Sequence, residues 1–253
     1  MSEYQYYYFE SIDKPLTDEE QQELPKISTR AEINSRRFVN KYQWGDLKTN
    51  PKVLMEKYFD VHLYYANWGT RIIMFKVPAK SVDFDLMKQY ETEETLRITK
   101  KGVSVIIDIT ADVEENEEWW KIETEIKKFI SLRDDLIAGD YRCLYIAWLA
   151  QNRNENKGKY KIPPVPAKIK KLTETLRSFA DFMYLDSDTL TTAVQSAGTN
   201  ALKEPTFKEI KTWVTELPEK DKQKFLIYLL QEKESVQNIQ RNLRKRFLDD
   251  RKK

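Results

Sequence analysis

The chain has 253 residues and a formal net charge of +2, with 40% hydrophobic and 33% charged residues. A chain of this length and composition can bury a substantial core, which excludes a wholly disordered protein. Its 6 glycines and single cysteine argue against glycine-rich phosphate-binding loops and exclude an internal disulfide.

The N-terminal residues lack the basic start and apolar run of a secretory signal. No apolar run approaches the roughly 20 residues that span a bilayer. A lone thiol also fits a reducing compartment. The sequence therefore predicts a cytoplasmic protein without a membrane partner.

Strand patterns alternate with short helices over the first 113 residues. Aromatic residues 4–12 predict a strand, and residues 31–44 predict a strand or an extended segment. Thr17 and Glu20 have the spacing of a helix-capping box. Asn50, followed by proline, marks the start of a second helix. These patterns predict a sheet accompanied by short helices.

Apolar and aromatic residues are densest at 58–78. Residues 61–65 and 71–77 predict two strands, joined by a turn at 67–70. The second strand is apolar without alternation at 72–75, which is typical of a strand covered on both faces. We expect this hairpin to lie at the centre of the sheet, followed by a second hairpin that turns at Gly102.

Helical spacing replaces the strand patterns after residue 113. Residues 117–139 and 141–149 predict two helices, and the proline- and lysine-rich residues 152–171 predict a linker. Further helices are predicted beyond this linker, at 172–184, 188–195, 207–216 and 218–248. The predicted fold is α+β, with a mixed or antiparallel sheet domain over 1–113 and a helical domain over 114–253.

The last predicted helix carries an apolar seam near the C-terminus. Its members recur at three- and four-residue intervals, which is typical of a helix that packs along one side. The seam residues proposed for interaction are Val236, Ile239, Leu243 and Phe247. The helix is expected either to dock a partner or to cover a small helical bundle of its own chain.

Catalytic candidates are few. On a strand, Asp60 and His62 face the same side, so the acid is placed to orient the imidazole, but no nucleophile motif accompanies them. Cys143 fits a small apolar filler on a buried helix. One histidine and one cysteine do not supply a four-ligand zinc site. We therefore expect no catalytic residue, no cofactor and no metal site.

Polar residues interrupt the aromatic stretch. Arg71 beside Trp68 would bind an anion or a peptide if an acid such as Asp46 lay nearby. Asn67 belongs to the same turn. The simpler interpretation is an internal ion pair between Arg71 and Asp46 that holds two loops together.

Basic residues gather in two places. Residues 157–171 contain several lysines and no acid, and the C-terminal helix is basic. Such residues contact phosphates in nucleic-acid-binding proteins. The candidates for this role are Lys168, Lys170, Lys171, Arg244 and Arg246.

Several short motifs stand out. They are the N-terminal Ser-Glu-Tyr-Gln-Tyr-Tyr run, Phe-Val-Asn at 38–40, Trp-Gly-Asp at 44–46, Ala-Asn-Trp-Gly-Thr-Arg at 66–71 and Arg-Cys-Leu-Tyr at 142–145. With these motifs, most of the chain resembles an uncharacterised family of bacterial proteins. The resemblance implies no activity. Some relatives continue past the basic helix, so residues 241–253 are expected to be a truncated or naturally short end.

Function is predicted mainly from what is missing. The lack of a catalytic set, the linker and the last helix favour a non-enzymatic intracellular adaptor that binds another protein. With the resemblance, this becomes an accessory component of a bacterial regulatory or defence complex. The second alternative is a nucleic-acid-binding accessory protein. The third is an enzyme that uses Asp60, His62 or Cys143.

Overall fold

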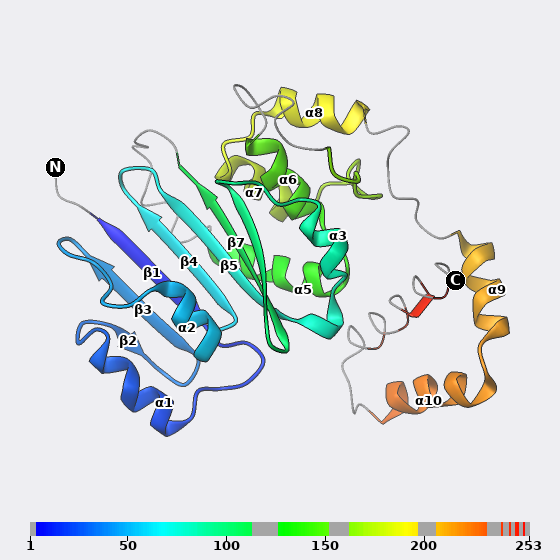
Figure 1. Ribbon diagram of the computed structural model, residues 1–253, viewed down its shortest axis with the longest axis horizontal. Coiled ribbons are helices and arrows are strands. Elements are labelled where there is room, and N and C mark those ends of the chain that lie inside the picture. Colours follow the sequence, from blue (N-terminus) through cyan, green and yellow to red (C-terminus); the bar gives the residue numbers. More distant parts are fainter. Residues whose placement is uncertain are drawn as a thin grey trace.

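A seven-stranded antiparallel sheet forms the centre of the fold (Figure 1). The computed structural model describes residues 4–112, 126–151, 162–196 and 206–231, together with Ile239, Leu243, Arg246, Phe247 and Asp250. The strand order is β2-β3-β1-β4-β5-β7-β6. The strands are β1 (Gln5–Glu10), β2 (Glu32–Ile33), β3 (Arg37–Tyr42), β4 (Val61–Ala66), β5 (Arg71–Pro78), β6 (Leu96–Lys101) and β7 (Ser104–Ala111).

Both predicted hairpins are confirmed. β4 pairs with β5, with Tyr65 opposite Arg71, and β6 pairs with β7 across a turn in which Gly102 has a φ of +56°. A positive φ suits glycine, because it has no Cβ to clash with the backbone. β4 is fourth of the seven strands, so the dense aromatic stretch lies at the centre of the sheet, as predicted.

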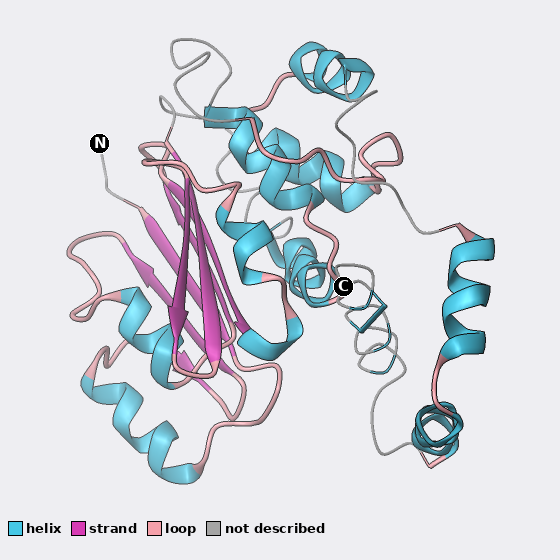
Figure 2. Ribbon diagram, turned by 45° about the vertical axis from the view of Figure 1, so that its right-hand side comes forward, coloured by secondary structure: helices cyan, strands magenta, loops and turns pink. Residues whose placement is uncertain are grey.

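Helices cover both faces of the sheet (Figure 2). One face packs against α3 (Phe84–Lys88), α5 (Leu132–Ile137), α6 (Arg142–Gln151) and α7 (Glu174–Phe182) in the larger core. The opposite face packs against α2 (Pro51–Lys57) and the 3₁₀ turn Leu24–Lys26 that follows α1 (Asp18–Glu23). Further 3₁₀ turns are Ala79–Ser81 and Ile126–Ser131. The sheet is therefore the middle layer of three.

Helix starts follow the sequence closely. Thr17 and Glu20 form the predicted capping box of α1, and the Asn50 side chain accepts a hydrogen bond from the backbone N–H of Lys52 at the start of α2. In place of the single helix predicted over 117–139, the described part of this range contains the 3₁₀ helix Ile126–Ser131 followed by α5, and residues 113–125 lie outside the described part. The predicted helix at 141–149 corresponds to α6.

Strands and the first helices of the second half share one core. Side chains of β4, β5 and β7 pack with those of α5, α6 and α7 in the larger core. Val165 and Ile169, from the predicted linker 152–171, are 4% and 1% exposed in that core. Val165 and Ile169 thus anchor this part of the predicted linker to the helical layer, whereas Ile162 is 67% exposed. Residues 152–161 lie outside the description.

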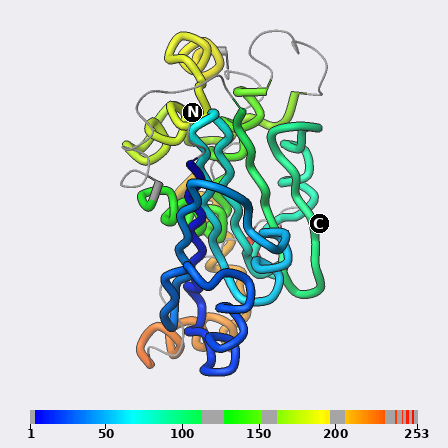
Figure 3. The backbone as a smooth tube through the Cα atoms, turned by 90° about the vertical axis from the view of Figure 1, so that its left-hand side faces the viewer, coloured from blue at the N-terminus to red at the C-terminus, as the bar shows by residue number. Residues whose placement is uncertain are grey.

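Two further helices, α8 (Ser187–Ser196) and α9 (Phe207–Glu216), match their predicted ranges, and α10 (Glu219–Leu230) follows them. Figure 3 shows α7 and α8 at the end of the sheet where β1 begins. Figures 1 and 2 show α9 and α10 apart from the sheet, on the side of the helical layer.

The prediction of one helix over 218–248 is wrong. α10 ends at Leu230, and Arg246 forms a 2.7 Å ion pair with Asp221. In a continuous helix these two residues would be separated by about 37 Å, at 1.5 Å per residue. Asp221 and Arg246 therefore do not lie on one continuous helix.

The α+β prediction is confirmed by the antiparallel sheet in the N-terminal half and the helices after it. Within the described segments, no helix combines the length and apolar character needed to cross a bilayer.

Candidate functional site

The predicted ion pair between Asp46 and Arg71 does not form. Asp46 accepts a 2.9 Å hydrogen bond from Gln5 Nε2, and Gln5 Oε1 accepts from the hydroxyls of Tyr7 and Tyr64. Tyr7 and Tyr64 belong to the core on the α2 face of the sheet. Alternate residues of a strand point to the same face, so Arg71 is on the side of Ile73 and Phe75. These two residues belong to the larger core, on the other face of the sheet. The two residues are on opposite faces, so the prediction is wrong.

Asn67 and Trp68 hold the turn itself. Asn67 Oδ1 accepts a 3.0 Å hydrogen bond from the backbone N–H of Tyr4, and Trp68 Nε1 donates to Thr70 Oγ1 at 3.1 Å. Trp68 is 40% exposed, whereas Arg71 is 4% exposed. The four candidate residues thus form no common site: Asp46 and Asn67 fix loops, Trp68 faces outward and Arg71 lies inside.

Asp60 and His62 are likewise not paired. The His62 ring is stacked on Phe9, with a centroid distance of 4.0 Å, and its Nδ1 lies 3.1 Å from the carbonyl oxygen of Tyr8. A carbonyl only accepts hydrogen bonds, so Nδ1 carries the proton. Burial lowers the pKa of His62 to about 3, which keeps the ring neutral. His62 is therefore a neutral side chain packed inside the sheet's core.

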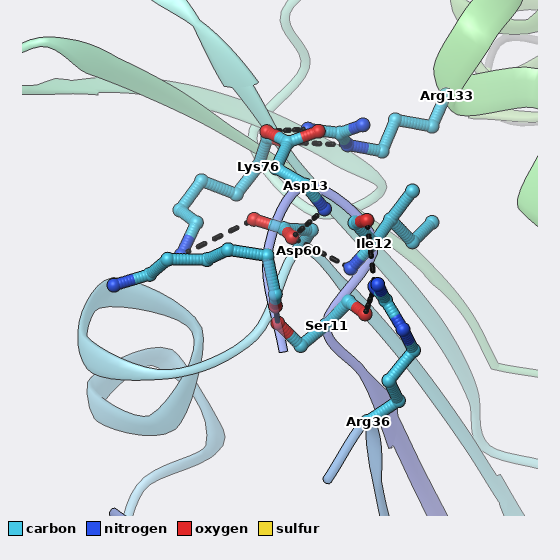
Figure 4. A network of polar contacts seen from close by, with 8 residues as sticks. Ser11, Ile12, Asp13, Arg36, Asp60, Lys76 and Arg133 are labelled. Carbon is cyan, nitrogen blue, oxygen red and sulfur yellow. Dashed lines mark hydrogen bonds and ion pairs between the residues drawn. The ribbon is translucent and has the colours of Figure 1, made fainter. Parts of the chain in front are cut away.

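Asp60 instead organises a polar network around the loop after β1 (Figure 4). Its Oδ2 accepts hydrogen bonds from the backbone N–H groups of Ile12 and Asp13 at 2.8 and 2.9 Å. Its Oδ1 lies 3.4 Å from Lys76 Nζ. The carboxylate is thus used to hold a loop, and no nucleophile is among its partners in this network.

Two arginines complete the network. Arg133, from α5 and 2% exposed, donates from Nε to the carbonyl of Lys76 at 2.8 Å and from Nη2 to Asp13 at 2.6 Å. Arg36 donates to the carbonyls of Ser11 and Ile12. Burial lowers the pKa of Lys76, although Asp60 opposes that shift. These contacts tie the sheet, the β1 loop and α5 together.

Cys143 is buried in α6, and burial raises the pKa of its thiol. The prediction of a small apolar filler on a buried helix is confirmed by the place of Cys143 in the larger core. Across the described segments, no group of three or more histidine, cysteine, aspartate or glutamate side chains is arranged to hold a metal ion.

The proposed nucleic-acid contacts differ in their surroundings. Lys168, Lys170 and Lys171 are exposed, and Arg142 donates hydrogen bonds to the backbone carbonyls of Lys168 and Lys171. Arg246 is held by Asp221, and this hydrogen bond raises its pKa. Arg244 lies outside the described residues. Arg246 is therefore already committed to an acid of its own chain.

The proposed interaction seam is partly covered. Ile239 and Phe247 are 1% and 4% exposed, and Phe247 makes an edge-on contact with Trp213 of α9 at a centroid distance of 5.3 Å. Leu243 is half-buried, and Val236 lies outside the description. Of the two alternatives predicted for this seam, packing against its own chain holds at Ile239 and Phe247, so these two side chains do not form an open docking face.

Other apolar side chains of the same region are exposed, and the sequence analysis did not single them out. On α9 they recur at i, i+3 and i+7, which places them on one side of the helix. The most exposed members are Phe207 at 81% and Leu230 at 84%. We call the following set the terminal apolar face: Phe207, Ile210, Val214, Leu226, Ile227, Leu229 and Leu230. Helical periodicity was visible in the sequence, but only the structure shows which side is covered.

Comparisons with known proteins give no further assignment: no family model matches the chain, and neither curated proteins nor solved structures yield a significant match. The terminal apolar face and the buried Arg71 are therefore interpreted from their own geometry.

Proposed function

We propose that the protein is a non-enzymatic protein–protein interaction subunit that binds its partner through the terminal apolar face. The observation that carries this proposal is the exposure of large apolar side chains on α9 and α10. Contiguous exposed apolar surface is a common mark of interaction sites, whereas single exposed apolar residues are ordinary.

The arrangement favours a partner with an amphipathic helix. Phe207, Ile210 and Val214 form a ridge on α9, and a ridge of this spacing packs into the groove of another helix. The exposed Lys208 and Lys211 lie beside this ridge. Their charge favours acidic residues at the edge of the partner's apolar stripe.

The resemblance to bacterial proteins suggests the setting of this role. We propose an accessory subunit of a regulatory or defence complex in the bacterial cytoplasm. The packing of Cys143 and His62 supports a non-enzymatic role, since the thiol and the neutral imidazole are both buried in structural surroundings.

Affinity purification from the native host tests the proposal. The full chain is compared with a double variant, Phe207→Asp and Leu230→Asp, which places charges on the terminal apolar face. Val103→Asp is the matched control, because Val103 is an apolar residue that is 86% exposed in the β6–β7 turn. Thermal unfolding of each purified variant establishes that it is folded.

We expect the double variant to lose a protein that the wild type and the Val103→Asp control both retain. The same partners in all three samples would contradict the proposal. Analytical sedimentation of the purified wild type measures its mass in solution. A dimer would show that the terminal apolar face binds a second copy of this chain.

A further inference from the structure

Arg71 is a buried cation at the start of β5. It lies opposite Tyr65 of β4 in the strand pairing. Both residues are on the face of the sheet that packs against α5, α6 and α7. Arg71 is 4% exposed and Tyr65 is 1% exposed. A charged side chain at such a position normally has an acid or several acceptors as partners.

The partners that Arg71 has are few and neutral. Its Nη1 donates a 3.2 Å hydrogen bond to the carbonyl of Phe182, at the end of α7. Its Nε is sealed from solvent without an acceptor, and the Tyr65 hydroxyl is sealed without a partner as well. None of the described acids forms an ion pair with this guanidinium or alters its pKa, which burial lowers. Arginine nevertheless stays charged.

Aromatic rings surround the guanidinium. The Arg71 Cζ lies 4.1 Å from the centroid of the Tyr184 ring, 5.4 Å from that of Phe182 and 5.9 Å from that of Tyr65. These rings stabilise the cation through their negative faces but supply it with no counter-charge. The rings contact the guanidinium but accept none of its conventional hydrogen bonds, so the N–H donors on its edge still need acceptors.

Tyr184 reaches this position at a cost in backbone conformation. Its φ is +52°, and it is the one described residue other than glycine with a positive φ. Two residues after the end of α7, this left-handed conformation is usually adopted by glycine. Residues with strained backbone conformations are concentrated at binding and active sites.

We propose that Arg71 and Tyr65 form a binding site for a carboxylate. Because Nη1 is used by Phe182, the remaining edge of the guanidinium consists of Nε and Nη2, two parallel N–H donors that match the two oxygens of a carboxylate. The Tyr65 hydroxyl is the third donor, and Tyr184 stacks on the face of the ion pair.

The number of charges favours a carboxylate over a phosphate. The contacts of Arg71 with described residues are to Tyr65, Phe182 and Tyr184, none of which is a cation. Phosphate sites usually combine several cations or backbone N–H groups. A monoanion also neutralises the buried charge without leaving excess negative charge. The carboxylate can belong to a small molecule or to an acidic side chain of a protein.

The Arg71 Nε–H resonance in the full-length protein reports binding directly. The wild type is titrated with acetate, with a capped glutamate peptide and with inorganic phosphate, at constant ionic strength maintained with chloride. We expect a saturable shift with acetate and weaker binding of phosphate. Tighter binding of acetate than of the peptide indicates a small-molecule ligand, and the reverse indicates a protein side chain.

Variants separate the site from general anion effects. Tyr65→Phe keeps the ring and removes one neutral hydrogen-bond donor, so the dissociation constant for the better carboxylate should rise about three- to tenfold. Arg71→Met should abolish binding. Arg177→Met is the control, because Arg177 is exposed on α7; its affinity should equal that of the wild type.

The proposal is overturned if neither carboxylate gives a saturable shift in the wild type, or if phosphate binds more tightly than both. Equal carboxylate affinity in Tyr65→Phe removes the role of that hydroxyl. Should Arg71→Met fail to fold, the wild-type titration and the Tyr65→Phe variant still decide the matter, because both retain the guanidinium.

Discussion

His62 shows how burial sets the chemistry of a single side chain. The ring is 0% exposed, its Nε2 has no hydrogen-bond partner, and burial lowers its pKa to about 3 against an ordinary value of 6.5. The folded protein therefore binds this proton less readily than the unfolded chain does. Between pH 6.5 and 3 only the unfolded state is protonated, so stability is present above pH 6.5 and falls as the pH falls.

We expect the free energy of unfolding to drop by about 2 kcal/mol more in the wild type than in His62→Gln when the pH is lowered from 7 to 5. The glutamine does not titrate, so all other groups contribute equally to both proteins. Urea unfolding at the two pH values measures the difference. Equal losses in the two proteins would show that His62 takes up its proton in the folded state.

Tyr184 allows backbone strain to be separated from side-chain contacts. Replacement by alanine or by glycine removes the ring beside Arg71 in both cases, but only glycine relieves the φ of +52°. Glycine usually destabilises a folded chain relative to alanine. Here we expect the order to be reversed, with Tyr184→Gly more stable than Tyr184→Ala by about 1 kcal/mol.

Chemical denaturation of both Tyr184 variants provides the measurement. An alanine variant as stable as the glycine variant would mean that residue 184 leaves the left-handed region once its ring is gone. The strain would then be imposed by the contact with Arg71 rather than by the end of α7.

Little of this residue-scale detail was predictable. The sequence placed Arg71, Trp68 and Asp46 in one group, since each lies near a turn in an aromatic stretch. Arg71 and Asp46 are on opposite faces of the sheet. The position of Asp46 is fixed by a hydrogen bond from Gln5, 41 residues earlier in the chain. Burial of His62 was predictable because Val61 and Leu63 flank it, and burial of Cys143 was predictable because its helix is largely apolar.

At the scale of elements, local signals were reliable and distant ones were not. The caps at Thr17 and Asn50 were predictable because a cap depends on residues within one helical turn. Both hairpins followed from strand patterns beside short turns. The partners of Asp60 were missed because its hydrogen-bond donors at Ile12 and Asp13 lie 48 and 47 residues away.

The end of α10 illustrates the same limit. Its sequence continues with good helix formers, so propensity predicted a helix over 218–248. The contacts of Arg246 with Asp221 and of Phe247 with Trp213 join residues that are far apart in the sequence, so local propensity did not predict them. The exposed apolar side chains of this region are therefore found on α9 and α10, whereas Ile239 and Phe247 of the predicted seam are buried.

For the whole molecule, the important question is whether the sheet folds without the helices that follow it. The sequence predicted separate domains over 1–113 and 114–253. In the structure, one face of the sheet and helices α5–α7 share the larger core. Eight residues of β4, β5 and β7 in this core are 0% exposed: Val61, Leu63, Ile73, Phe75, Val77, Val105, Ile107 and Ile109. The strands before residue 113 and the helices α5–α7 after it thus contribute side chains to the same core.

We therefore expect a chain ending at residue 113 to lack a cooperative unfolding transition, whereas a chain ending at residue 196 retains one. Burying a large apolar side chain contributes about 1.5–3 kcal/mol. Losing half of that burial at eight positions removes about 6–12 kcal/mol, which is comparable to the roughly 5–15 kcal/mol that stabilises a whole domain. Urea unfolding followed by circular dichroism compares both fragments with the full chain. A cooperative transition in the shorter fragment would establish the sheet as an independent domain, because its strands would then fold without α5, α6 and α7.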